Sequence, residues 1–256
     1  MVEILFGELM KSSKTGFTLI EMSIVMLIIG LIIGGILTGR DLITAAKIRA
    51  TVSQIEKYNT AVRTFQLKYN RFLPGDIPDP YASQFGFVAR GAYAGEGDGN
   101  DVIEGIGGHN PNWNSATYQT GGETAMFWVD LSTAGLIKDS FNTATPITAQ
   151  NLLTGSEIDL YLPKTPIRES HITVSSRDQN IGGVTFGTGV ISANENYFQV
   201  ANITQLTNIE NTYLPSFTVS EAHNLDKKLD DGLPQFGKVI AAFRTFANYY
   251  VGPITM

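Results

Sequence analysis

The segment that most constrains this chain is an almost unbroken apolar run over residues 17–37, FTLIEMSIVMLIIGLIIGGIL. As an α-helix, its 21 residues are about 32 Å long, which is enough to cross the hydrocarbon core of a bilayer. Its one charged residue is Glu21, and a carboxylate in such a helix costs roughly 2.5–3.5 kcal/mol on insertion. An acid placed there is expected to have a function and a partner.

The residues that flank the start of this run form a recognisable motif. Residues 11–16 read KSSKTG, so two lysines and Gly16 stand directly before Phe17. With the FTLIE that follows, this pattern resembles the processing site of type IV prepilins and pseudopilins. The resemblance implies that a prepilin peptidase cuts the chain after Gly16 and that Phe17 becomes N-methylated. It also implies that Glu21 is required for subunits to join a filament.

The chemistry of the motif agrees with the implied role. Cleavage would leave a cationic amine on Phe17, about one helical turn from Glu21. In a helical stack of subunits, Glu21 of one subunit can meet the Phe17 amine of its neighbour. An ion pair in a medium of low polarity sets register more reliably than it adds net stability. We therefore expect this pair to fix the stagger between subunits.

Two simpler interpretations of the apolar run explain less. A plain signal anchor that happens to contain a glutamate does not account for Gly16, Phe17 and Glu21 in register. A removable secretory signal peptide usually has an apolar region of about 7–15 residues followed by a small-x-small cleavage site. The run over residues 17–37 is longer, and no such site follows it.

The resemblance also implies where the chain acts and with which partners. It implies a single pass through the bacterial inner membrane, with the N-terminus cytoplasmic before cleavage, and later a periplasmic or extracellular filament. The implied partners are the peptidase, an inner-membrane assembly platform, and copies of itself or other pilins. Charge alone does not give this orientation, because the lysines of the leader are balanced by Glu3 and Glu8.

Beyond the apolar run, the hydrophobic pattern predicts that the same helix continues. Apolar residues recur in steps of three and four on one helical face: Ile48, Val52, Ile55, Tyr58, Val62, Phe65 and Tyr69. We expect one continuous helix from Phe17 to about Tyr69, because no proline occurs before Pro74. The alternative is two helices broken at Thr38–Gly39. The expected division is a cleaved leader (1–16), a long helix (17–70, with 17–37 transmembrane) and a globular head domain (71–256).

The pattern after residue 73 predicts a head that mixes short helices with strands, so that the expected class is α+β and pilin-like. LPGDIPDP (73–80) ends the long helix, and residues 81–121 form a long loop. A helix is expected over about 123–134, stopped by Gly135, with a buried side made of Ala125, Phe127, Trp128 and Leu131. A second helix is expected over 220–232, with Ser220 as its cap. The expected strands are 171–176, 183–192, 196–203 and 238–243.

Composition limits the classes of partner. The chain contains no cysteine, so an exported head must be held by its core, by backbone pairing or by an ion. Residues 38–71 carry a net charge of +5 and residues 72–256 a net charge of −10. The acidic head argues against nucleic-acid binding and is compatible with binding of cations.

One acidic stretch in the head has the residue types of a calcium site. GEGDGNDVIEG (95–105) offers oxygen ligands from Asp98, Asn100, Asp101 and Glu104, and its glycines allow backbone carbonyls to turn inward. Calcium takes six to eight such oxygens. The alternative is a solvated acidic turn. Calcium is the only cofactor that the sequence suggests.

The sequence offers no catalytic constellation, and we expect no enzyme. The three histidines, His109, His171 and His223, lack zinc-ligand spacing, and no G-x-S-x-G nucleophile elbow occurs. The function that the prepilin resemblance implies is a structural subunit, a major or minor pilin, of a type IV pilus-like filament. The alternatives are a type II secretion pseudopilin and a calcium-binding adhesin module displayed on a pilin stalk. A membrane-anchored enzyme is the least favoured.

Overall fold

A computed structural model of the chain describes residues 16–93, 95–105, 120–146, 152–176, 195–206, 212–214, 217–233, 237, 239 and 249–253. The chain divides into two compact units, Met1–Ala45 and Ala46–Met256. The boundary falls within a helix, so that the second part of this helix belongs to the same unit as the head.

Helix α1 (Leu19–Lys68) contains 50 residues and continues through Gly39. The single helix expected from about residue 17 to residue 69 is therefore confirmed, and the alternative break at Thr38–Gly39 is wrong. The helix ends where Asn70 and Arg71 adopt left-handed backbone angles, with φ of 53° and 70°. The prolines of residues 73–80 then prevent any further helix.

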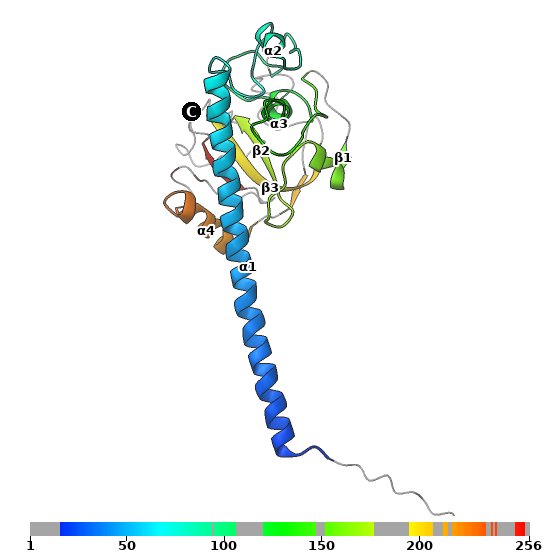
Figure 1. Cartoon of the computed structure of the whole chain (residues 1–256), viewed down its shortest axis with the longest axis vertical. Helices are drawn as coiled ribbons and strands as arrows, with labels where there is room; N and C mark the ends of the chain where they lie inside the picture. The colour runs from blue at the N-terminus through cyan, green and yellow to red at the C-terminus, as the bar shows by residue number, and fades with distance from the viewer. Residues whose placement is uncertain are drawn as a thin grey trace, which may run out of the picture. The chain divides into compact units, whose positions relative to one another are not determined.

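The second part of α1 supplies one wall of the head's core. Of the predicted positions, all but the half-buried Val52 are buried: Ile48, Ile55, Tyr58, Val62 and Phe65 within α1, and Tyr69 directly after it. Thr51 and Ala61 are buried on the same helix. The ring of Tyr58 meets that of Trp128 edge-on, with centroids 5.0 Å apart, and lies 6.2 Å from the ring of Phe198. Trp128 belongs to helix α3 and Phe198 to strand β3, so these contacts join α1, α3 and the sheet (Figure 1).

Helix α3 (Glu123–Thr133) is the central helix of the head. It confirms the helix expected over about 123–134, and its four expected core residues are all buried. Gly135, with φ of 68°, follows the C-cap Ala134, where a left-handed residue commonly ends a helix. Two shorter helical segments are α2 (Tyr81–Gln84) and the 3₁₀ helix η1 (Gly155–Leu160).

The sheet is organised around its longest strand, β3 (Asn196–Leu206). Strands β2 (His171–Ser176) and β5 (Tyr249–Pro253) pair with its first half, and β1 (Leu153–Thr154) and β4 (Thr212–Leu214) pair with its second half. All four pairings are antiparallel. Val174 stands opposite Phe198, and both are buried on the face that meets α1 and α3. The α+β, pilin-like class is confirmed.

Helix α4 (Val219–Leu229) confirms the second expected helix but corrects its cap. Thr218, not Ser220, is the N-cap, because its side chain accepts the Glu221 N–H while Glu221 accepts the Thr218 N–H. The spacing T-x-x-E is the sequence signature of this capping box.

The remaining strand expectations have mixed outcomes. Strands 171–176 and 196–203 are confirmed as β2 and β3. The expected strand 183–192 lies outside the described residues, as does 238–243 except for Val239. Strand β5 was not expected.

Candidate functional site

The predicted processing junction lies in irregular, exposed chain directly before α1. Gly16, Phe17 and Thr18 precede the first helical residue, Leu19. The side chain of Phe17 is 80% exposed. An extended, accessible backbone is the form in which a peptidase can bind a substrate chain.

Glu21, in the first turn of α1, exchanges hydrogen bonds with Thr18. Its Oε2 accepts the Thr18 backbone N–H at 2.7 Å and the Thr18 hydroxyl at 2.8 Å. In return, the Glu21 N–H donates to Thr18 Oγ1 at 3.3 Å. This is a capping box, which satisfies backbone donors that a helix start leaves without partners. The carboxylate is thus held beside the residue that follows Phe17.

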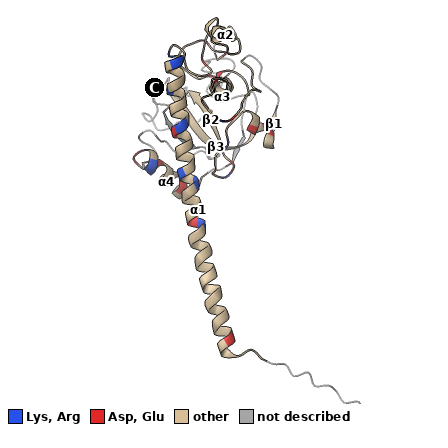
Figure 2. Cartoon of the chain, in the orientation of Figure 1, with Lys and Arg blue, Asp and Glu red and all other residues tan. Residues whose placement is uncertain are grey.

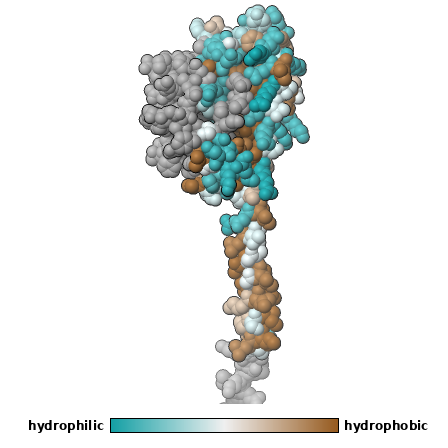
Figure 3. All heavy atoms as spheres, turned by 90° about the vertical axis from the view of Figure 1, so that its left-hand side faces the viewer, coloured by the Kyte–Doolittle hydropathy of each residue, from teal (hydrophilic) through white to brown (hydrophobic). Residues whose placement is uncertain are grey.

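The part of α1 in the first unit exposes an apolar surface. Figure 2 shows α1 without charged residues between Glu21 and Arg40, and hydrophobic side chains cover much of the same stretch in Figure 3. Among the described residues, α1 is the one helix long and apolar enough to span a membrane. No part of its most apolar window is buried inside the chain. A surface of this kind requires lipid or other apolar helices around it.

Comparison with known families identifies the same segment. Residues 11–37 match the family profile described as the prokaryotic N-terminal methylation motif. The chain carries the type IV prepilin signature. No curated protein and no solved structure gives a significant match. The motif therefore supports a type IV pilin-like or pseudopilin precursor, and it points to a structural subunit rather than an enzyme.

In the head, two buried carboxylates organise the stretch that the sequence predicted as a calcium loop. Asp76 accepts the backbone N–H groups of Gly99 at 2.5 Å and of Asp101 at 2.8 Å. Glu123, the first residue of α3, accepts those of Gly97 at 2.9 Å and of Glu104 at 2.8 Å. The loop therefore turns four amide donors toward two acids that lie far from it in the sequence.

The surroundings of these acids oppose their ionisation. Burial raises the pKa of Asp76 to about 7, although the N–H donors of Gly99 and Asp101 oppose the shift. Burial, followed by the charge of Asp76, raises the pKa of Glu123 well above its usual range. Carboxylates held this closely share a proton or require a compensating cation.

Of the four predicted calcium ligands, one lies beside these acids. Oxygens of Asp98, Asp76 and Glu123 all lie within 4.8 Å of one another. Asn100 instead bonds to Asp98 and Val102. Asp101 is exposed, and it contacts Asp76 through its backbone N–H. The side chain of Glu104 is buried. Sequence reasoning missed Asp76 and Glu123, because both lie outside the acidic stretch 95–105 from which the ligands were predicted. The one available signal in the sequence was an aspartate, Asp76, directly after the helix-ending segment LPG (73–75).

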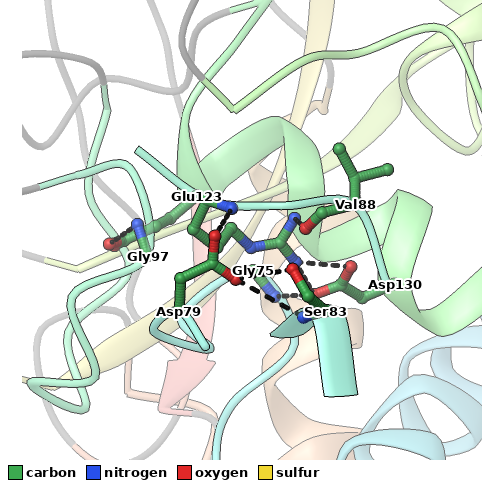
Figure 4. A network of polar contacts seen from close by, with 8 residues as sticks. Gly75, Asp79, Ser83, Val88, Gly97, Glu123 and Asp130 are labelled. Carbon is green, nitrogen blue, oxygen red and sulfur yellow. Dashed lines mark hydrogen bonds and ion pairs between the residues drawn. The ribbon is translucent and has the colours of Figure 1, made fainter. Parts of the chain in front are cut away.

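A buried ion pair holds the start of the loop against α3. Arg90 Nη2 donates to Asp130 Oδ1 at 2.7 Å and to Oδ2 at 2.6 Å, and neither side chain has appreciable exposure. Figure 4 shows Asp130 also facing Gly75, whose N–H donates to Asp130 Oδ2 at 2.7 Å. The backbone of Arg90 donates to Asp79 Oδ2 at 2.9 Å. This network fixes the chain on both sides of α2 relative to α3.

The described histidines have structural partners. His171 Nε2 contacts Asp159 Oδ1 at 2.9 Å, and burial lowers the pKa of His171. His223 Nδ1 lies 3.1 Å from the carbonyl of Gly232. His109 lies outside the described residues.

Proposed function

We propose that this chain is a subunit of a type IV pilus-like filament, as a major or minor pilin. In this proposal, prepilin peptidase cuts after Gly16 and Phe17 is N-methylated. The new N-terminus then begins two residues before α1. The subunit assembles through the apolar part of α1 with copies of itself or with other pilins.

The observation that carries the proposal is the combination of the methylation motif with an apolar helix that the chain itself leaves uncovered. A bilayer covers such a surface before assembly, and neighbouring apolar helices can replace the lipid afterwards. The proposed sequence of locations is therefore the bacterial inner membrane, with an assembly platform there, followed by a periplasmic or extracellular filament.

The glycines of α1 support packing against other helices. A methyl group added at Gly30, Gly34, Gly35 or Gly39 would meet no other atom within 4 Å, apart from the nearby backbone of α1 itself. The fold of the described chain therefore does not require glycine at these positions, although glycine weakens a helix by about 1 kcal/mol relative to alanine. The spacings Gly30-x-x-x-Gly34 and Gly35-x-x-x-Gly39 allow close approach of a second helix.

Glu21 supplies the directional contact of the proposed assembly. In the capping box it faces the backbone of Thr18, the residue next to Phe17. After cleavage, Phe17 carries a cationic amine. We propose that Glu21 pairs with the Phe17 amine of a neighbouring subunit, and that this pairing sets the stagger between their helices.

Intact-mass spectrometry of the native chain tests this function in two fractions, sheared surface filaments and membranes. The expected result is the form that lacks residues 1–16 and carries one methyl group, recovered with sheared filaments. The same form confined to membranes would favour a type II secretion pseudopilin. Recovery of the uncut chain alone would contradict the proposal and leave a plain anchor.

A calcium-binding head displayed on the pilin stalk is a second candidate, favoured by the approach of Asp98 to Asp76 and Glu123. We propose calcium binding at this group, with the Asp98 carboxylate as the exposed ligand. The test is the melting temperature of the full chain in detergent micelles with calcium and with chelator, for wild type and Asp98→Asn. An equal melting temperature in both conditions for the wild type would contradict calcium binding here. Loss of surface adhesion with intact filaments in Asp98→Asn would favour the adhesin.

A further inference from the structure

A second group of carboxylates lies at the C-terminal end of α4, away from the 95–105 loop in sequence. Oxygens of Asp226, Asp230 and Asp231 lie within 4.8 Å of one another. Asp226 belongs to the last turns of α4, Asp230 is its C-cap and Asp231 follows. The end of a helix already carries partial negative charge from its free carbonyls. A helix C-terminus usually favours cationic side chains, so a cluster of three acids is unfavourable there without a compensating cation.

Asp226 brings to this group a buried oxygen that lacks a partner. The residue is only 3% exposed. Its Oδ1 accepts the Gly232 N–H at 3.3 Å, whereas its Oδ2 is buried and has no hydrogen-bond partner in the described part of the chain. A buried carboxylate oxygen of this kind is destabilising unless a proton or a cation compensates it. This observation is independent of the clustering, and it points to a missing ligand.

Among the described residues, the two lysines that follow Asp226 in sequence do not supply that compensation. Lys227 and Lys228 lie in the last turn of α4, but both are exposed. Among the described residues neither forms an ion pair with Asp226, and His223 contacts the Gly232 carbonyl. Burial raises the pKa of the Asp226 carboxyl, and the charges of Asp231 and Asp230 add to this effect. Among the described residues, no cation compensates the buried Asp226 carboxylate.

The following chain turns back over the same oxygens. Asp230 Oδ2 accepts the Val239 N–H at 3.4 Å. A methyl group added to Gly237, whose φ is 78°, would overlap Asp230 Oδ2 and lie 3.2 Å from Asp231 Oδ2. Because residue 237 is glycine, Asp230 Oδ2 and Asp231 Oδ2 can both lie next to it, and oxygens of these two residues lie within 4.8 Å of Asp226.

We propose that Asp226, Asp230 and Asp231 bind a calcium ion that ties the end of α4 to the chain after it. An all-oxygen set of three carboxylates suits hard cations and not zinc or copper, which prefer nitrogen and sulfur ligands. Calcium is favoured over magnesium, because calcium accepts irregular sets of six to eight oxygens while magnesium demands a near-ideal octahedron. Water completes the shell on the exposed side of Asp231. The expected affinity is that of extracellular calcium modules, with a Kd of about 10⁻⁴–10⁻³ M.

Calorimetric titration of the full chain in detergent micelles with calcium chloride tests the proposal. Asp226→Asn keeps an oxygen for the Gly232 N–H, and it should weaken one binding event on the order of tenfold or more, because affinity depends on the number of charged ligands. Asp230→Asn is a second variant with the same expected result. Asp98→Asn is the matched control, and it should leave this binding event unchanged. Absence of calcium binding in the wild type, or binding that neither variant weakens, would overturn the proposal.

A stability measurement provides a second readout that a merely structural role would not give. Without calcium, Asp226→Asn should raise the melting temperature of the full chain, because it replaces a buried ionisable carboxyl group that lies next to the carboxylates of Asp230 and Asp231. With saturating calcium the order should reverse, because the wild type gains more binding free energy at this site than the variant does. A variant that is less stable than the wild type by the same amount in both conditions would contradict the proposed site.

Discussion

Thr18 and Glu21 exchange hydrogen bonds across the first turn of α1, with the Glu21 carboxylate accepting both the N–H and the hydroxyl of Thr18. Glu21, which we expect to pair with the N-terminal amine of a neighbouring subunit, therefore already contacts Thr18 next to the proposed N-terminus of its own subunit. A free carboxylate in a membrane helix is unfavourable, and two hydrogen bonds reduce that penalty while the subunit stays in the bilayer. In the proposed assembly, Glu21 would exchange one hydrogen-bond partner for another and would not bury an unpaired charge.

Substitution of Glu21 separates its cap role from its charge. Glu21→Gln keeps an oxygen that can accept the Thr18 N–H, whereas Glu21→Ala removes both the cap and the charge. We expect both variants to be cut after Gly16 and methylated, and neither to enter filaments, because both lack the anion that pairs with the Phe17 amine. Mass spectrometry of membrane and sheared fractions measures both steps. Normal filament incorporation of Glu21→Gln would show that the charge is not needed.

Gly34→Leu tests whether the glycines of α1 serve packing between subunits. Since no atom of the described chain beyond its own helix backbone lies within 4 Å of an added methyl group, the isolated subunit should fold and be processed normally. Close helix approach in the filament should be blocked, so that the sheared fraction loses most of the protein. Ile33→Leu, a change of shape at an exposed neighbour, is the control. Equal filament yields from both variants would contradict this role.

Removal of Arg90 should strongly destabilise the head. Arg90→Met leaves Asp130 buried without its counter-charge, which typically reduces the free energy of unfolding by about 3–5 kcal/mol. Arg168→Met breaks the more exposed pair with Glu221 and should change it by less than about 1 kcal/mol. Urea unfolding of the full chain in micelles, followed by tryptophan fluorescence, compares them. Similar losses for the two variants would mean that the Arg90 pair does not hold the head together.

Glu123→Gln should loosen the loop that the two buried acids organise. A glutamine accepts only through its oxygen, so that one of the N–H groups of Gly97 and Glu104 loses its partner. We expect a loss of about 1–3 kcal/mol in the free energy of unfolding and faster hydrogen exchange at both amides. Glu157→Gln, at the exposed capping box of η1, is the control. Unchanged exchange at Gly97 and Glu104 would contradict the proposed organisation.

Asp76 should make the stability of the head depend on pH. Its pKa of about 7 in the folded state lies above the ordinary 3.8, so the folded state holds the proton more tightly. With chelator present, the free energy of unfolding should therefore fall as pH rises from about 4 to about 7, by at most about 1.4 kcal/mol per pH unit. Asp98→Asn removes a neighbouring charge that raises this pKa, so that the fall should end at a lower pH and be smaller in total. Thermal melting across this range measures both, and a flat profile would exclude a protonated Asp76.

The sequence alone determined the features of this protein that depend on local order along the chain. The apolar run, its Gly16–Phe17–Glu21 motif and the three-and-four spacing to Tyr69 predicted the processing signature and a single long helix. Helical periodicity is a property of neighbouring residues, which is why no partner segment was needed to infer it. Helix α3 and strands β2 and β3 were recognisable for the same reason.

Tertiary structure alone decided which acids of the head come together. The sequence grouped Asp98 with Asn100, Asp101 and Glu104 because they are adjacent, whereas the fold groups it with Asp76 and Glu123. Likewise, only packing shows that Asp226 is buried beside Asp230 and Asp231, and that its Oδ2 has no partner among the described residues. Burial and convergence of charges depend on how distant segments pack. A linear pattern shows which groups can ionise, but their surroundings in the fold decide whether the charge requires a proton or a cation.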